Sequence, residues 1–283
     1  MKKAGFIMIT IMLGLFITPI MLANANDVPQ PLSLPADYRI LDNAEADVTG
    51  DGYIDTIYLT GHQRQIGSLY TDDLSITVEN GADHSLTRYP LNKLGGYRMH
   101  LFAGDFSGDK VADVYVEVES GGSGGWSYHN IISLNANDPK EIFGEQNNQS
   151  KSITGKFIDG LKAEITNTVN GKTIAIDVRE RLKDYLRLGI YGEDGIVKKE
   201  TSIMIAPFSK LEPIDYDRDG IFELKGIQRI SGAYRADGIA DVETVLKYNG
   251  TAWNSQSVKV TVFMDTAGVG IVAPKPASSS APN

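Results

Sequence analysis

The sequence contains no cysteine, and only 2 of its 283 residues are tryptophan. Without cysteine the chain can form neither a disulfide nor a thiolate metal site, and no cysteine can serve as a nucleophile. The four histidines are scattered and lack the His-Glu-x-x-His or His-x-His spacing of zinc sites. The sequence also lacks a P-loop and a dinucleotide-binding glycine pattern. These absences argue against thiol, zinc and nucleotide chemistry.

Basic residues are few: 27 lysines and arginines stand against 36 aspartates and glutamates, which gives a formal net charge of −9. Nucleic-acid binding depends on clustered basic side chains, so no nucleic-acid partner is expected. Binding to anionic lipid is disfavoured for the same reason. An acidic surface suits a protein that concentrates divalent cations.

Long apolar runs are confined to the N-terminus. Two lysines precede an apolar run at residues 4–22, which Pro19 interrupts, and residues 23–25 (Ala-Asn-Ala) supply a small-x-small cleavage pattern. We predict that residues 1–25 are a signal peptide, the alternative being a retained membrane helix. Its removal takes the net charge from −9 to −11, because the segment contains two lysines and no acid. We expect the mature chain, which has no second run of spanning length, to be secreted, either extracellular or associated with the cell envelope.

Two segments of biased composition flank a central domain. Residues 26–37 contain three prolines and are predicted to be a linker, and residues 269–283, rich in proline, serine and alanine, are predicted to be a disordered tail. In residues 38–268, short runs rich in isoleucine, valine, threonine and tyrosine alternate with Asn-Gly, Gly-Gly and Asp-Gly, a pattern typical of β-strands. These runs lie at 53–60, 74–79, 97–104, 111–119, 129–134, 162–167, 172–178, 221–227, 240–248 and 257–263. A helical pattern at 178–186 is long enough for two or three turns.

The runs also repeat at long range. An acidic loop enters a run at about residues 47, 105 and 215, with intervals of 58 and 110 residues. The second interval is close to twice the first, so we expect a degenerate copy near 157–166 that keeps the strand but has lost most acids. A period of roughly 50–60 residues with four strands is typical of propeller blades. We predict an all-β, β-propeller-like fold of roughly four to five blades with about four strands each; the alternative is an irregular β-sandwich with inserted calcium loops.

The three acidic loops carry oxygen-bearing side chains at the same relative positions 1, 3, 5 and 9. These residues are Asp47, Thr49, Asp51 and Asp55 in the first loop, Asp105, Ser107, Asp109 and Asp113 in the second, and Asp215, Asp217, Asp219 and Glu223 in the third. The carbonyl groups at position 7 belong to Tyr53, Val111 and Ile221. Calcium takes about six to eight oxygen ligands in a flexible geometry, whereas magnesium requires a strict octahedron and keeps several waters. The spacing therefore predicts three calcium sites, the alternative being aspartate-rich surface turns.

Position 6 of each loop turns sharply, which favours glycine. Gly52 and Gly220 meet this requirement, whereas the second loop has Lys110, whose positive φ would cost about 1 kcal/mol. Ligand charge differs as well, because the third loop offers four carboxylates and each of the others offers three. Together, the two criteria predict that calcium binds most tightly to the third loop, then to the first, then to the second.

These loops resemble those of the VCBS and FG-GAP repeat families, in which a D-x-[DNST]-G-D-G-x-x-D loop precedes a blade strand of a β-propeller. The likeness is greater to secreted VCBS repeat-containing proteins of Gram-positive, spore-forming bacteria. It rests on segments 46–61, 101–134 and 213–254, which include ADVTGDGYIDTIYLTG, FSGDKVADVYVEVE and DYDRDGIFELKG. The resemblance implies calcium binding and a propeller-like fold, with no established reaction.

A glycine-rich run at residues 120–125 is followed by Trp126, Tyr128 and His129. Glycine allows a ligand to approach the backbone closely, and the aromatic side chains could form a platform for a sugar ring. The alternative is a flexible hairpin tip with a packed tryptophan. The sequence favours the hairpin tip, and the three residues stay candidates for ligand binding.

Two functions from different classes fit these features. The first is a non-enzymatic, calcium-stabilised exported protein that binds a glycan or protein partner at the cell envelope or spore surface. The second is a secreted, calcium-dependent hydrolase acting on polysaccharide or phosphoester, because carboxylates from distant parts of a chain can meet in space. The missing catalytic patterns favour the first.

Overall fold

The computed structural model describes residues 32–263, except for residues 66, 92–93, 123–124 and 150–151. The described chain from Leu34 onward forms one compact unit. The predicted signal peptide (1–25) and the predicted disordered tail (269–283) lie outside the described residues, as do residues 26–31 of the predicted linker.

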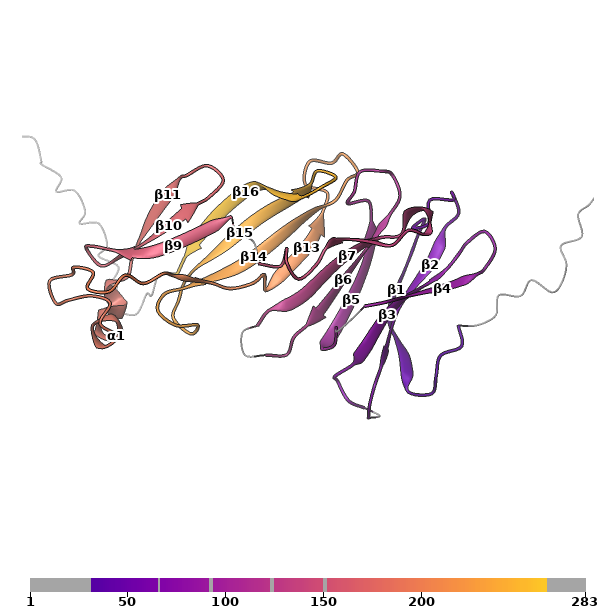
Figure 1. Ribbon diagram of the computed structural model, residues 1–283, viewed down its shortest axis with the longest axis horizontal. Helices are drawn as coiled ribbons and strands as arrows, with labels where there is room; N and C mark the ends of the chain where they lie inside the picture. Colours follow the sequence, from indigo (N-terminus) through magenta and orange to yellow (C-terminus); the bar gives the residue numbers. More distant parts are fainter. Residues whose placement is uncertain (1–31, 66, 92–93, 123–124, 150–151, 264–283) are drawn as a thin grey trace, which may run out of the picture. The chain divides into compact units, whose positions relative to one another are not determined.

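Each sheet of the described chain is antiparallel and is built from strands that are close together in the sequence (Figure 1). The first sheet contains β1 (Tyr38–Ala46), β2 (Asp55–His62), β3 (Asp72–Glu79) and β4 (Leu86–Pro90) in that order. The second contains β5 (Tyr97–Gly104), β6 (Asp113–Glu119), β7 (Ser127–Ser133) and β8 (Lys140–Phe143). The third contains β9 (Ile153–Ile158), β10 (Lys162–Asn167) and β11 (Thr173–Asp177). In the fourth, β14 (Glu223–Ser231), β15 (Gly238–Tyr248) and β16 (Trp253–Val262) follow one another, and β14 also pairs with β12 (Met204–Ile205) and β13 (Lys210–Ile214).

Helical structure in the described chain is short, as the sequence predicts. It consists of the 3-10 turns η1 (Asn135–Asn137) and η2 (Arg179–Arg181) and the helix α1 (Leu182–Arg187). The last two lie at the segment with the helical pattern, and every predicted strand run overlaps an observed strand. The all-β class is confirmed, and four successive antiparallel sheets are compatible both with a propeller-like arrangement and with a sandwich.

The second sheet is buried on both faces. Along its strand β6, Val114, Val116 and Val118 belong to a core shared with the first sheet, whereas Tyr115 belongs to a core shared with the fourth. Successive side chains of a strand point to opposite faces, so this division follows directly from the alternation. All four side chains are at most 1% exposed. The first, second and fourth sheets therefore pack face to face in that order.

The order in which the sheets pack differs from their order in the sequence, because the fourth sheet lies against both the second and the third. Ile165 of β10 lies in one core with Ile230 of β14 and Val242 of β15, so the third sheet packs on the fourth. The strand expected in the degenerate copy exists as β10, but only residues 159–161 separate it from β9, and no acidic loop precedes it. The 110-residue interval therefore contains a further sheet, in which β10 is the second strand, as β2, β6 and β14 are in theirs, but without the acidic loop, as predicted for the degenerate copy.

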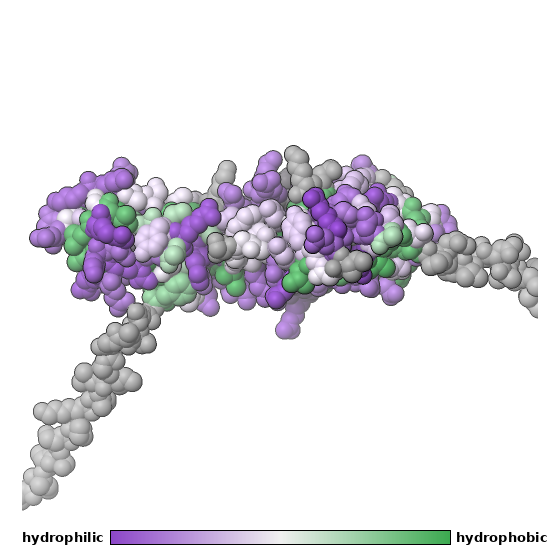
Figure 2. Space-filling model, turned by 90° about the horizontal axis from the view of Figure 1, so that it is seen from below, coloured by the Kyte–Doolittle hydropathy of each residue, from purple (hydrophilic) through white to green (hydrophobic). Residues whose placement is uncertain are grey.

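No helix within the described ranges is long and apolar enough to cross a bilayer. Figure 2 shows one face of the molecule, on which apolar side chains form small separate patches among polar ones. Extended apolar patches mark interaction sites, and this face presents mostly polar groups instead.

Candidate functional site

The three acidic loops occupy equivalent places in three sheets. The first joins β1 to β2, the second joins β5 to β6, and the third joins β13 to β14. Each thus connects the first of four successive strands to the second, and its last acid begins a strand, as Asp55 does for β2. The equivalence that the sequence spacing predicts is therefore present in the fold.

The acid at position 1 closes the first and second loops by accepting backbone N–H groups. Asp47 accepts hydrogen bonds from the N–H groups of Gly50 (2.7 Å) and Gly52 (2.9 Å). Asp105 accepts the equivalent pair in the second loop, at 2.6 and 2.8 Å. Each of these carboxylate oxygens has a further lone pair, so the carboxylate can form the turn and still bind a cation.

The acid at position 9 is buried in all three loops: Asp55, Asp113 and Glu223 are at most 1% exposed. It accepts the N–H groups of loop positions 2 and 3 in the second loop, where one oxygen of Asp113 bonds Phe106 (2.9 Å) and Ser107 (2.8 Å). Burial raises the pKa of Asp113 despite these bonds. A positive charge nearby would offset the cost of burying this carboxylate.

The acid at position 5 is held by a residue from the end of the third strand of the same sheet. The Asn80 amide donates to Asp51 (2.7 Å), and this bond holds the pKa of the Asp51 carboxyl below its usual value. In the second loop the Asn135 amide donates to Asp109 (2.8 Å). In the third loop Lys247, at the end of β15, takes the place of the asparagine. Sequence reasoning missed all three of these partners.

The ammonium group of Lys247 lies among the carboxylates of the third loop. Its Nζ atom is 2.8 Å from Asp217, 2.9 Å from Asp219 and 2.7 Å from Glu223. Its contacts with the carboxylates of Asp217, then Glu223 and Asp219, raise the pKa of Lys247 far above its ordinary value. In the described chain, the one set of three acids whose oxygens lie within 4.8 Å of one another is Asp215, Asp217 and Glu223, which belongs to this loop. The acids of the first and second loops are spaced more widely.

Successive loops are joined by equivalent backbone hydrogen bonds. The N–H group of Ala112, at position 8 of the second loop, donates to the carbonyl of Asp47 (2.9 Å). In the same way Phe222, at position 8 of the third loop, donates to the carbonyl of Asp105 (2.7 Å). The loops therefore form one continuous row, in which the first residue of one contacts the end of the next.

Positions 4 and 6 of every loop have positive φ. At position 6, φ is 88° in Gly52, 72° in Lys110 and 86° in Gly220. The strain predicted for Lys110 is therefore present. At position 4, two loops have glycine, but the third has Arg218 with a φ of 63°, a strained position that the sequence analysis did not identify.

We expect replacement of Lys110 by glycine to stabilise the protein. Glycine adopts positive φ without a steric penalty, and the loss of strain exceeds the entropy that glycine adds to the unfolded chain. The expected gain is about 0.5–1 kcal/mol in the free energy of unfolding, measured by urea denaturation. A Lys110→Ala variant, which keeps the strain but removes the charge, is the control; an equal gain in both variants would assign the effect to charge.

The residues of the second loop fit a bound cation. Within the described chain, Ser107 Oγ at position 3 is buried and has no hydrogen-bond partner. An orphaned buried hydroxyl is costly unless a ligand satisfies it. In the first loop, Thr49 Oγ1 at the same position donates to Asp55 at 3.2 Å and accepts from the Asn80 amide at 3.4 Å, which leaves it one free lone pair. Both loops offer hard oxygen donors, which are the ligands that calcium prefers.

The structure separates the aromatic residues proposed as a sugar platform. The rings of Trp126 and Tyr128 meet edge to face, with centroids 4.8 Å apart. His129 points to the other face of β7, is 1% exposed, and its Nδ1 atom lies 2.9 Å from the Tyr115 hydroxyl. That hydroxyl donates to the carbonyl of Leu211 (2.5 Å). His129 is therefore a core residue that helps to join the second and fourth sheets.

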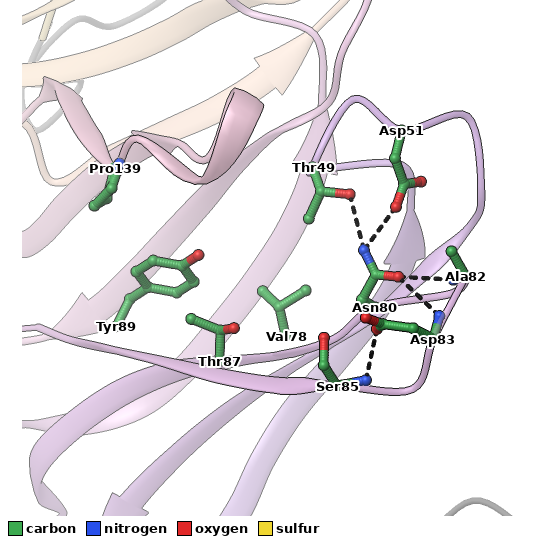
Figure 3. A pocket seen from close by; sticks show the side chains of 10 residues that line it. All are labelled: Thr49, Asp51, Val78, Asn80, Ala82, Asp83, Ser85, Thr87, Tyr89 and Pro139. Atoms are coloured by element: carbon green, nitrogen blue, oxygen red, sulfur yellow. Dashed lines mark hydrogen bonds between the residues drawn. The ribbon is translucent and has the colours of Figure 1, made fainter. Parts of the chain in front are cut away.

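A cavity of about 610 Å³ adjoins the first loop (Figure 3). Its lining includes Asp51 of the loop, Asn80 and Asp83 of the β3–β4 turn, and Tyr89. Asn80 connects the first loop to the β3–β4 turn, because its amide donates to Asp51 and its carbonyl accepts the N–H of Ala82 (2.7 Å). The cavity combines hydroxyl, amide and carboxylate groups with one aromatic ring.

Comparisons with known proteins place this chain among relatives. A family model described as the YybI C-terminal domain matches residues 151–261, which contain the third and fourth sheets. The chain is also similar to the protein named "Uncharacterized protein YybI" of Bacillus subtilis (strain 168), with 35% identity over 235 residues. The aligned region covers 83% of this chain and 88% of that protein. With this identity and coverage, the chain belongs to the YybI family.

Proposed function

We propose that this chain is an exported calcium-binding β-repeat protein without catalytic activity, which serves as a binding or structural module at the cell envelope or spore surface. The observation that carries the proposal is the repeated loop. Three sheets have the same loop between equivalent strands, with oxygen donors at the same positions. Aspartate-rich surface turns would not require the last acid of each loop to be buried.

Calcium is the cation that best fits this donor set. The first and second loops supply carboxylates, hydroxyl groups and backbone carbonyls, and supply neither nitrogen nor sulfur. A bound ion would satisfy Ser107 Oγ and offset the charge of the buried Asp113. The resemblance to VCBS and FG-GAP repeats favours the same cation. Calcium would thus stabilise the row of loops that connects the sheets.

The cavity beside the first loop is the partner site that we propose. Its lining of Asp51, Asp83 and Asn80 with the ring of Tyr89 suits a polyhydroxylated ligand such as an envelope glycan. The same two aspartates are where the alternative function, a calcium-dependent hydrolase, would have to find its carboxylate pair. A glycan array followed by product analysis separates the two: binding without cleavage supports the module, and cleavage that Asp83→Asn abolishes supports the hydrolase.

We expect calcium to raise the thermal unfolding midpoint of the protein. A ligand that binds only the folded state stabilises it by about 1.4 kcal/mol per site when its concentration is ten times the dissociation constant. For a domain of this size that corresponds to an increase of about 3–5 °C per site over the midpoint in excess chelator. The measurement is a pair of thermal melts, with calcium and with chelator.

Two acids of the same cavity provide the matched comparison. Asp51→Asn removes a proposed ligand and should lose the contribution of the first loop. Asp83→Asn changes an exposed acid outside the loop positions and should keep the full calcium response. Identical midpoints in calcium and in chelator for the unmodified chain would contradict the proposal.

A further inference from the structure

The third loop differs from the other two in what lies between its acids. In the first and second loops a neutral amide, from Asn80 or Asn135, donates to the acid at position 5. In the third loop the equivalent group is the charged ammonium of Lys247. We propose that this ammonium is the permanent cation of the third loop, so that calcium binds at the first and second loops and not at the third. The stoichiometry part of this inference rests on the proposed function.

The ammonium group of Lys247 contacts three carboxylates of the loop. Its Nζ atom donates hydrogen bonds to Asp217 (2.8 Å) and Asp219 (2.9 Å) and lies 2.7 Å from Glu223 Oε1, which forms an ion pair with it but accepts no hydrogen bond within the described chain. The first two contacts are charge-assisted hydrogen bonds. Calcium would need the same oxygens at about 2.3–2.6 Å. The two cations would then lie so close that they repel each other, so calcium and Lys247 exclude one another from this loop.

Burial favours the lysine. Glu223 is 1% exposed, and the side chain of Lys247 is 24% exposed, so this ion pair is screened less than one on the open surface. Lys247 is also held in the fourth sheet near the end of β15, where it pairs with Asn254 of β16 and follows the last residue that pairs with β14, Leu246. The ammonium is therefore presented to the loop at no loss of translational freedom, an advantage that a free ion lacks.

The inference reverses the affinity order that ligand charge alone predicts. The third loop has the most carboxylates, but Lys247 neutralises part of that charge and contacts two members of the acidic cluster, Asp217 and Glu223. The short separation of these two acids is then a consequence of the ammonium that contacts both. The wider spacing of the acids in the other loops reflects neutral asparagine at the same place.

The test compares Lys247→Met with Lys225→Met. Lys225 lies on the neighbouring strand, and within the described chain its one ion pair is with Glu243 (3.3 Å), so its replacement controls for the loss of one lysine from the sheet. Calcium stoichiometry is measured by equilibrium dialysis. We expect two ions for the unmodified chain and for Lys225→Met, and three for Lys247→Met. In chelator, Lys247→Met should unfold about 5 °C below the unmodified chain, and calcium should restore this loss.

A second measurement tests the lysine in the unmodified chain and does not depend on any variant folding. Amine-reactive labelling followed by mass spectrometry should modify Lys247 at least tenfold more slowly than Lys225, equally in calcium and in chelator. Labelling of Lys247 that calcium accelerates, or a third ion that Asp217→Asn removes from the unmodified chain, would overturn the inference. Protection of Lys247 in a chain that binds no calcium would support the inference while contradicting the proposed function.

Discussion

Replacement of Asp55 by alanine should destabilise the protein by about 4 kcal/mol, whether or not calcium is present. This carboxylate is fully buried and accepts hydrogen bonds from the N–H groups of Val48 (2.9 Å), Thr49 (3.1 Å) and Gly81 (2.9 Å). Alanine would leave these buried donors unsatisfied, and each costs about 1–3 kcal/mol. The thermal midpoint in chelator is expected to fall by about 10 °C.

Asp51 is the matched control within the same loop. It is exposed, and its partners, the N–H of Tyr53 and the amide of Asn80, can bond to water when it is removed. Asp51→Ala should therefore cost about 1 kcal/mol or less in chelator. In calcium, both variants should lose the ion of the first loop. The difference between their free energies of unfolding should therefore be the same as in chelator. Equal losses for the two variants in chelator would mean that the buried acid has no structural role.

The free energy of unfolding should fall by about 2.5 kcal/mol between pH 7.5 and pH 4.5 because of His129 alone. Burial lowers the pKa of His129 to about 3 in the folded state, whereas an unfolded histidine has a pKa near about 6.5. Below that value the unfolded chain binds a proton that the folded chain does not. Stability from this group is therefore complete above about pH 6.5 and is lost as the pH falls toward about 3.

The check is urea denaturation of the unmodified chain and of His129→Asn at both pH values in calcium-free buffer. Asparagine keeps a donor near the position of Nδ1, which bonds the Tyr115 hydroxyl, but it does not titrate. All other titrating groups are common to both proteins, so the pH dependence that differs between them belongs to His129. If both proteins lose the same free energy, the histidine is not held neutral by burial.

The candidate loops were predictable because their geometry is local. Nine consecutive residues place the acids, and the backbone that they require is set by neighbouring residues, as the φ of Lys110 confirms. Their partners at position 5 come from much farther along the chain: Asn80 is 29 residues from Asp51, and Lys247 is 28 residues from Asp219. This nearly constant separation is a signal that an alignment of the repeats could have revealed.

The charge on that partner changes what the third loop can bind. Four acids in nine residues predict the tightest calcium site when the loop is considered alone. The ammonium of Lys247 arrives only through the pairing of β14 with β15, which no local pattern specifies. A ranking by ligand count therefore applies only where the space between the ligands is open to the ion.

The sequence by itself determined the all-β class, the central strands and the three acidic loops, because alternation and turn chemistry act over a few residues. It did not predict strands at the sheet edges such as β1, β4 or β13, in which Pro213 pairs with Leu224. These strands form because a buried neighbour offers hydrogen bonds, so their own residues carry a weak pattern. Tertiary structure alone decided which sheets touch and which residue contacts the acid at position 5 of each loop, since both depend on contacts between residues far apart in the chain.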